Sequence, residues 1–224
     1  MISSRLLLFA LLVCGVAAAN PAAIGFEKKW KQLELPETAS NEYTADGETL
    51  TVRSDNSADF YYRKLLSAKQ LDKANWQLSW EWRVLESTKA VATNTTEADD
   101  RPLAVHLWIN DRKSVGWFKG GLAKLFGIPT PGFMLTWSWG GTETVGSEFA
   151  NPHLPEGRGL ITIAAAGATA MEWQQQTVNV NDAISNLLTE VNDRIYLVIS
   201  ADNDGHGGRS VAQVRNLRLT RIAP

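Results

Sequence analysis

The chain has 224 residues, with 22 basic and 24 acidic side chains and a net charge of −2. Nucleic acid is excluded as an expected partner, because no basic cluster would meet its phosphates. The single cysteine, Cys14, excludes a disulfide within the chain, and a chain of this length can instead depend on one large packed core.

The first nineteen residues have the order of a secretory signal peptide. Arg5 is a positive n-region, residues 6–13 are an apolar h-region, and residues 17–19 are a small-residue cleavage site. The apolar run is shorter than the roughly 20 residues that a membrane span needs, so we expect no span after cleavage. The sequence therefore predicts a signal peptide at 1–19 and a single periplasmic or secreted domain at 20–224.

The N-terminal half is rich in strand patterns. Residues 20–35 predict either a helical turn or an edge strand, and residues 49–53 and 60–64 predict two short strands joined by a turn. The clearest alternation is residues 77–84, where one face carries only apolar side chains: Leu78, Trp80, Trp82 and Val84. A period of two over eight residues indicates a half-buried antiparallel strand.

The middle of the chain predicts two further strands around a long insertion. Residues 103–109 are one strand, with Trp108 on the face opposite the leucines, and residues 133–139 are the other. Between them, residues 111–131 carry glycines and prolines around a short apolar stretch, which favours a loop with a short helix.

The last third predicts strands at 160–164 and 173–180 and a helix at 181–192, capped by Asn181 or Asp182. Many short strands at regular spacing with one short helix favour an all-β fold. We expect an antiparallel two-sheet sandwich, jelly-roll-like.

The segment 195–219 is the densest strand signal of the chain. Residues 195–199 are five consecutive β-branched, aromatic or aliphatic residues, which predicts a strand buried on both faces. A turn rich in Asp and Gly follows at 200–209, and then a strand at 210–219 whose apolar phase changes at Arg215–Asn216, which predicts a β-bulge. The simplest interpretation is a hairpin at the centre of one sheet.

Several segments together resemble the bacterial family known as domain of unknown function 3047. The matching segments, spread in order over residues 76–219, are Leu78-Ser79-Trp80-Glu81-Trp82-Arg83-Val84, Asp99-Asp100-Arg101-Pro102, Leu135-Thr136-Trp137-Ser138-Trp139-Gly140, Asn151-Pro152 and Ser200-Ala201-Asp202-Asn203-Asp204 with Gly205. Asn203 and Gly205-His206 depart from the usual pattern of the family's last turn. The resemblance implies an exported β-sandwich and no particular activity.

Acidic residues occur in two close pairs where strands meet loops. The candidate ligand-binding residues of these segments are Asp99, Asp100, Arg101, Asp202, Asn203 and Asp204. Their oxygens are of the kind that Ca²⁺ binds. A simpler interpretation needs no ion: Asp202 and Asp204 cap the turn, and Asp99 or Asp100 pairs with an arginine such as Arg101 or Arg209. We favour this second interpretation and predict no metal and no cofactor.

Six of the nine tryptophans have a predicted place, either in the core or at the surface. Trp80, Trp82, Trp137 and Trp139 alternate with polar residues and are expected in the core. Trp108 is out of phase with the apolar face of its strand and Trp117 lies in the insertion, so both are candidates for contact with a ligand.

These features favour non-catalytic binding of a polar ligand, such as a glycan of the cell envelope, by loops near Asp100, Trp117 and Asp202. The histidines lack metal spacing and no Ser nucleophile motif occurs, so we assign no catalytic residue. Two alternatives are a purely structural envelope protein and a glycosidase-like hydrolase in which Glu143 or Glu148 pairs with Asp202.

Overall fold

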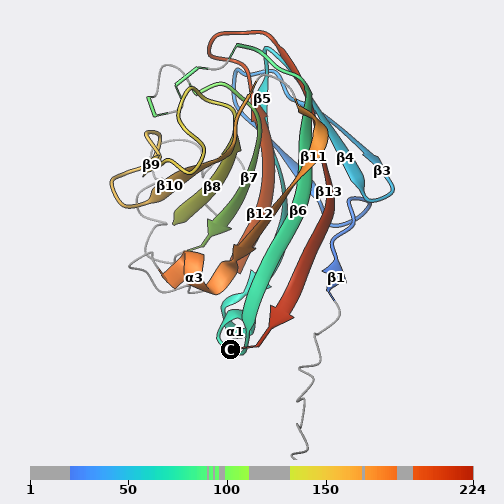
Figure 1. Cartoon of the computed structure of the whole chain (residues 1–224), viewed down its shortest axis with the longest axis vertical. Coiled ribbons are helices and arrows are strands. Elements are labelled where there is room, and N and C mark those ends of the chain that lie inside the picture. The colour runs from blue at the N-terminus through green and yellow to red at the C-terminus, as the bar shows by residue number, and fades with distance from the viewer. Residues whose placement is uncertain are drawn as a thin grey trace, which may run out of the picture.

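The computed structural model describes residues 21–89, 91–92, 94–95, 99–110, 132–167, 170–185 and 194–223. These residues form two β-sheets packed face to face, which confirms the predicted sandwich (Figure 1). Within these ranges no helix is long and apolar enough to cross a membrane. The predicted signal peptide and the insertion 111–131, with Trp117, lie outside the described residues.

The first sheet has six strands in the order β11-β6-β13-β4-β3, with β1 beside β13. The strands are β1 (Ala22–Ala23), β3 (Glu42–Asp46), β4 (Thr49–Asp55), β6 (Asn75–Glu86), β11 (Ala170–Asn179) and β13 (Arg209–Ile222). Every pairing in this sheet is antiparallel.

The second sheet has seven strands in the order β2-β5-β12-β7-β8-β10-β9. The strands are β2 (Lys31–Glu34), β5 (Ala58–Ser67), β7 (Arg101–Ile109), β8 (Phe133–Trp139), β9 (Glu148–Ala150), β10 (Gly159–Ala165) and β12 (Arg194–Asp202). One pairing departs from the expected antiparallel order: β10 runs parallel to β8. The long connection through β9 makes this possible, because parallel neighbours need a crossover of roughly a dozen residues or more.

Two short helices complete the described chain, α1 (Ala68–Leu71) and α3 (Val180–Ser185). The expected cap of α3 at Asn181 or Asp182 is wrong. The side-chain oxygen of Asn179 accepts the backbone N–H groups of both residues, at 3.1 and 3.3 Å. The helix therefore begins at Val180, and the rest of the predicted helix, residues 186–193, lies outside the described residues.

The predicted hairpin at 195–219 is wrong, because β12 belongs to the seven-stranded sheet and β13 to the six-stranded sheet. The turn between them crosses from one sheet to the other. Buried Asn203 holds this corner: its side-chain N–H donates to Ser210 Oγ at 2.7 Å, and its backbone N–H donates to the Ser57 carbonyl at 3.0 Å. The bulge in β13 is confirmed by a register shift between Arg215 and Arg218.

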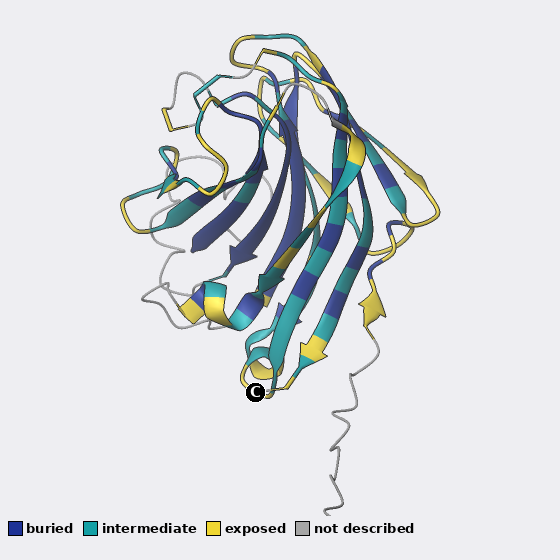
Figure 2. Ribbon diagram, in the orientation of Figure 1, coloured by how far each residue is buried: buried dark blue, intermediate teal, exposed yellow. Residues whose placement is uncertain are grey.

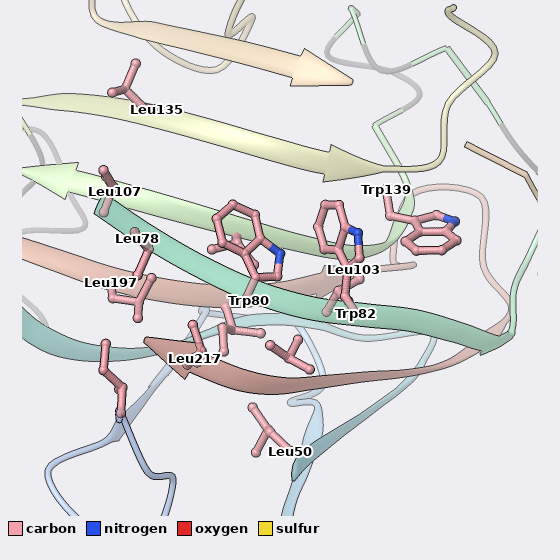
Figure 3. Close-up of a cluster of buried hydrophobic side chains, with 14 of the residues drawn as sticks. Leu50, Leu78, Trp80, Trp82, Leu103, Leu107, Leu135, Trp139, Leu197 and Leu217 are labelled. Atoms are coloured by element: carbon pink, nitrogen blue, oxygen red, sulfur yellow. The ribbon is translucent and has the colours of Figure 1, made fainter. Parts of the chain in front are cut away.

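The core lies between the two sheets. Figure 3 shows Leu78, Trp80 and Trp82 of β6 facing Leu103 and Leu107 of β7. The predicted core tryptophans pack edge to face: the rings of Trp80 and Trp82 are 5.7 Å apart and those of Trp82 and Trp139 are 5.5 Å apart. These three side chains are at most 1 % exposed. Trp137 is only half-buried and packs against the same core.

The outer faces of the two sheets differ. Figure 2 shows alternation of buried and half-buried residues along β6 and β13, but unbroken burial along most of β7, β8 and β12. The prediction that residues 195–199 are buried on both faces is therefore confirmed. Since only one face of the seven-stranded sheet meets the core, its second buried face needs a separate explanation.

A candidate ligand-binding face and its charged end

Four aromatic rings lie together on the outer face of the seven-stranded sheet. We call Phe60, Tyr62, Trp108 and Tyr196 the aromatic face. The Trp108 ring lies 5.0 Å from Phe60 and is stacked 6.3 Å from Tyr62, whose ring lies 6.1 Å from Tyr196. Trp108 and Tyr196 are 3 % and 8 % exposed, whereas Phe60 and Tyr62 are half-buried. The rings that a ligand can reach are therefore those of Phe60 and Tyr62.

The position of Trp108 agrees with its sequence phase, since it lies on the face of β7 opposite the core leucines. Its indole Nε1 is buried and has no hydrogen-bond partner among the described residues. Because the ring is almost fully covered, its role in this conformation is to support Phe60 and Tyr62 rather than to offer an open surface.

A buried histidine fixes the strands beneath the aromatic face. The ring nitrogens of His106 are 2.9 Å from Thr136 Oγ1 and 2.8 Å from Ser200 Oγ, so one side chain links β8, β7 and β12. Burial, and then the positive charge of Arg101, lowers the pKa of His106 well below its usual value. The imidazole is therefore neutral at physiological pH, and the two hydroxyls can satisfy both of its nitrogens.

At one end of this face, four charged side chains form a chain of contacts. We call Asp99, Arg101, His153 and Asp202 the charged end. Arg101 lies between two carboxylates, with Nη1 3.5 Å from Asp99 Oδ2 and Nη2 3.5 Å from Asp202 Oδ2. His153 Nε2 lies 2.8 Å from the same oxygen of Asp99. The charged end joins the aromatic face through Leu154, which packs in the cluster that contains Trp108.

The two carboxyl groups that flank Arg101 have different pKa values. Burial raises the pKa of Asp202 to about 7, although Arg101 opposes this rise. Burial acts in the same direction on Asp99, but the hydrogen bond from His153 and the charge of Arg101 outweigh it and lower the pKa of Asp99. The hydrogen bond to Asp99 in turn raises the pKa of His153. Asp99 is therefore ionised at neutral pH, whereas Asp202 keeps its proton to a much higher pH than an ordinary aspartate does.

The predicted cap of the turn after β12 is assigned to the wrong aspartates. Asp100, only 3 % exposed, accepts the backbone N–H groups of Gly205 at 3.0 Å and His206 at 2.9 Å. A Cβ on Gly205 would lie 2.9 Å from the Asp100 carboxylate, so glycine allows this close approach. The capping carboxylate therefore comes from a segment about a hundred residues away, which local turn rules do not reveal.

Three carboxylates approach one another beside this turn. One oxygen each of Asp100, Asp202 and Asp204 can be chosen so that all lie within 4.8 Å of one another. Such a group could hold a hard cation. However, both Asp100 oxygens already accept backbone hydrogen bonds, and Arg101 supplies a positive charge beside Asp202. The side chain of Asn203 points to Ser210 and adds no ligand.

The proposed pairing of Asp202 with Glu148 is excluded by the sheet order. Glu148 lies on β9 and accepts a hydrogen bond from Thr162, whereas Asp202 lies on β12. The strands β7, β8 and β10 separate them, a span of about 19 Å at the usual strand spacing. The two carboxyls of a glycosidase lie at most about 9.5 Å apart.

Sequence reasoning missed the residues that complete this face: Phe60, Tyr62, Tyr196 and His153. A signal for the first two was available, because residues 60–64 place two rings and a lysine on the same face of one strand. His153 had no such signal, since its contact with Asp99 depends on the path of the loop after β9.

Comparisons with solved structures recover the same sandwich. The xyloglucanase domain of a type three effector from Sinorhizobium fredii, in complex with cellobiose, superposes with a TM-score of 0.50 at 11 % identity, covering 86 % of this chain and 93 % of that one. A family 11 carbohydrate-binding module of a cellulosomal cellulase from Clostridium thermocellum gives a TM-score of 0.44 at 9 % identity, covering 92 % and 97 % of the two chains. At 11 % identity, the similarity to the xyloglucanase domain shows the fold alone.

A search of curated proteins finds no match to this chain. A family match covers residues 28–218, most of the chain, and agrees with the resemblance carried by the tryptophan and aspartate motifs. The chain belongs to the family described as proteins of unknown function, DUF3047.

Proposed function

We propose that this protein is a non-catalytic carbohydrate-binding domain whose ligand lies across the aromatic face and reaches the charged end. The observation that carries the proposal is the joint placement of two half-buried rings, Phe60 and Tyr62, and a set of charged hydrogen-bonding groups on one sheet. Sugars present C–H surfaces that pack on aromatic rings and hydroxyls that bind charged side chains.

The fold supports this class of ligand without identifying it. The xyloglucanase domain from Sinorhizobium fredii shares the sandwich and was solved with cellobiose. A ligand site of a few placed polar groups among aromatic side chains is the common form of small-molecule recognition. The proposal therefore rests on the side chains of the aromatic face rather than on the similarity in fold to the xyloglucanase domain.

The test is binding of the purified full-length mature chain to soluble glycans, measured by affinity gel electrophoresis and calorimetry. The panel contains xyloglucan, mixed-linkage β-1,3-1,4-glucan, agarose oligosaccharides and peptidoglycan fragments. We expect at least one glycan to bind, and Tyr62→Ala to weaken that binding tenfold or more. Trp173→Ala is the matched control, because this tryptophan lies on the six-stranded sheet, beside Arg83 and Arg215. Absence of binding by the wild type, or equal losses in both variants, would reject the proposal.

A second candidate function, glycoside hydrolysis, is favoured by one observation. Asp99 is ionised while Asp202 titrates near neutrality, and such a split between two carboxyls is typical of a base and an acid in glycosidases. Both groups are tied to Arg101, which favours binding over catalysis. Release of reducing ends from the same glycan panel, lost in Asp202→Asn, would instead establish the hydrolase.

Export of the protein is a further part of the proposal. It rests on the order of charge, apolar run and small residues in positions 1–19. Intact mass spectrometry of the periplasmic or secreted protein should find Asn20, or a close neighbour, as the first residue. A mature protein that keeps Met1 would contradict export by cleavage.

A further inference from the structure

The charged end has hydrogen-bonding capacity that its own contacts do not use. Among the described residues, Arg101 Nε and Asp202 Oδ1 are buried and have no hydrogen-bond partner. A carboxylate offers about four acceptor sites and a guanidinium five donors, so the contacts with Asp99 and Asp202 leave part of both groups unused. A buried polar atom without a hydrogen-bond partner destabilises the folded state. Stability alone therefore does not explain this arrangement.

The same side chains keep an open edge. The exposed fractions are 17 % for the Asp99 side chain, 11 % for Arg101 and 15 % for Asp202. Asp202 Oδ1 and Arg101 Nε are themselves buried, so a ligand at the open edge reaches these two atoms only when the side chains turn toward it.

We infer that Arg101 and Asp202 determine specificity by binding adjacent hydroxyl groups of a sugar ring at the charged end. A hydroxyl both donates and accepts, so one hydroxyl can accept from the Arg101 guanidinium while its neighbour donates to the Asp202 carboxylate. A carboxylate on the ligand would meet Asp99 and Asp202, and an ammonium would meet Arg101. A ligand carboxylate would be repelled by the aspartates and a ligand ammonium by Arg101, so neither group suits both Arg101 and Asp202. This inference rests on the proposed function and names the chemistry of the same site.

Protonation does not remove this match. When the Asp202 carboxyl is protonated it donates, and a sugar hydroxyl then accepts. The groups that face it are Arg101 on the neighbouring strand β7, Asp99 and His153 beyond Arg101, and Asp204 with Asp100 beside the turn. A change in protonation should therefore alter the strength of binding rather than abolish it.

The experiment uses the mature full-length chain with xyloglucan and mixed-linkage β-1,3-1,4-glucan, by calorimetry at pH 6 and pH 8. Arg101→Lys removes the planar guanidinium and should weaken binding tenfold or more at both pH values. Asp202→Asn keeps the shape but does not titrate at this position, so its affinity should change less between the two pH values than that of the wild type, and the change that remains is that of His153. Asp46→Asn, an exposed aspartate on β3 of the other sheet, is the matched control and should bind as the wild type does.

The outcomes separate this inference from the proposed function. If Tyr62→Ala loses binding but Arg101→Lys and Asp202→Asn bind within twofold of the wild type, the inference is wrong and the proposed function stands. If the wild type binds neither glycan and none of the wider panel, the proposed function fails and the inference fails with it. Circular dichroism and chemical denaturation of each variant establish that a loss of binding is not a loss of folding.

Discussion

The two sheets share one core and differ on their outer faces. On the six-stranded sheet the outer residues are polar and pair across strands, as Arg83 does with Gln213 and Arg215 does with Glu81, at 2.8 Å each. On the seven-stranded sheet, the outer face carries a cluster around the buried Trp108, Met134, Tyr196 and Val198, flanked by the half-buried Phe60 and Tyr62. A sheet with one solvated face is the usual antiparallel arrangement, and the buried outer face of the seven-stranded sheet is the reason why we propose the ligand site there.

The difference can be followed in the sequence of single strands. Residues 77–84 alternate strictly, so β6 has one apolar and one polar face. In β7 and β12 the run is nearly continuous, and the polar residues that interrupt it, His106 and Ser200, are hydrogen-bonded to each other. Because these buried polar groups are hydrogen-bonded to each other, the strands can be buried on both faces without unpaired polar groups at these two positions.

The shared core should give the largest effect. Trp80→Ala empties a site that is 1 % exposed, and we expect the free energy of unfolding to fall by about 3–5 kcal/mol. Chemical denaturation measures this loss, provided that the m-values of the variant and the wild type are equal. A loss below about 1 kcal/mol, the usual effect of a surface change, would mean that the two sheets do not pack through β6.

The charged end should make stability depend on pH. Because burial raises the pKa of Asp202 to about 7, the folded state holds a proton that the unfolded state releases near pH 4, and stability should fall as pH rises from 4 to 7. The raised pKa of His153 acts in the same direction near the upper end of this range. The lowered pKa of Asp99 matters only below about pH 4.

Asp202→Asn tests this pH dependence directly. Between pH 4 and pH 8, we expect the free energy of unfolding of the variant to rise relative to that of the wild type by about 2–4 kcal/mol, since each pKa unit corresponds to about 1.4 kcal/mol. Denaturation curves at several pH values provide the measurement. A difference between the two proteins that stays constant with pH would show that Asp202 is ionised throughout.

Mutations in the turn that crosses between the sheets, after β12, should lower the stability of the protein by a smaller amount. Asp100→Ala removes the acceptor of two backbone N–H groups, and we expect a loss of about 1–3 kcal/mol. Asp204→Ala is the matched control, because this aspartate is exposed and its contact with Thr38 is long, at 3.4 Å. Equal losses for the two variants would argue against Asp100 as the residue that closes the turn.

Of these changes, the addition or removal of calcium should change the stability of the protein least. Since Asp100 is occupied by backbone amides and Arg101 lies beside Asp202, we expect the melting temperature to stay constant when Ca²⁺ or a chelator is added. A cation that binds the folded state would raise the melting temperature with concentration by mass action. A rise with Ca²⁺ that a chelator reverses would assign Asp100, Asp202 and Asp204 to a metal site.

Much of the fold was predictable because the strand signal is local. The alternation in residues 77–84, the doubly buried strand at 195–199 and the bulge near Asn216 are all found where the pattern placed them. The pairing of strands was not predictable: a turn rich in Asp and Gly suits a hairpin and a crossing between sheets equally well. The buried amide of Asn203, which decides between them, has partners that are distant in space and sequence.

The candidate site was predictable only in part. The predicted pairing of Asp99 with Arg101 is confirmed, but the sequence offered no means to see that Arg101 would also contact Asp202. Trp108 was found by its phase, yet its burial depends on Phe60 and Tyr62 from another strand. Sites built from several strands depend on register and sheet order, which local patterns do not contain.

The central claim is that the outer face of the seven-stranded sheet is the binding surface, and nuclear magnetic resonance can test it residue by residue. The labelled mature protein would be titrated with the glycan that binds best in the panel, and amide shifts would be followed. If the ligand binds this face, the largest changes in amide chemical shift should occur at Phe60, Tyr62 and Asp202. Shifts concentrated instead at Arg83 and Gln213 on the other sheet, or no shifts with any glycan, would contradict it.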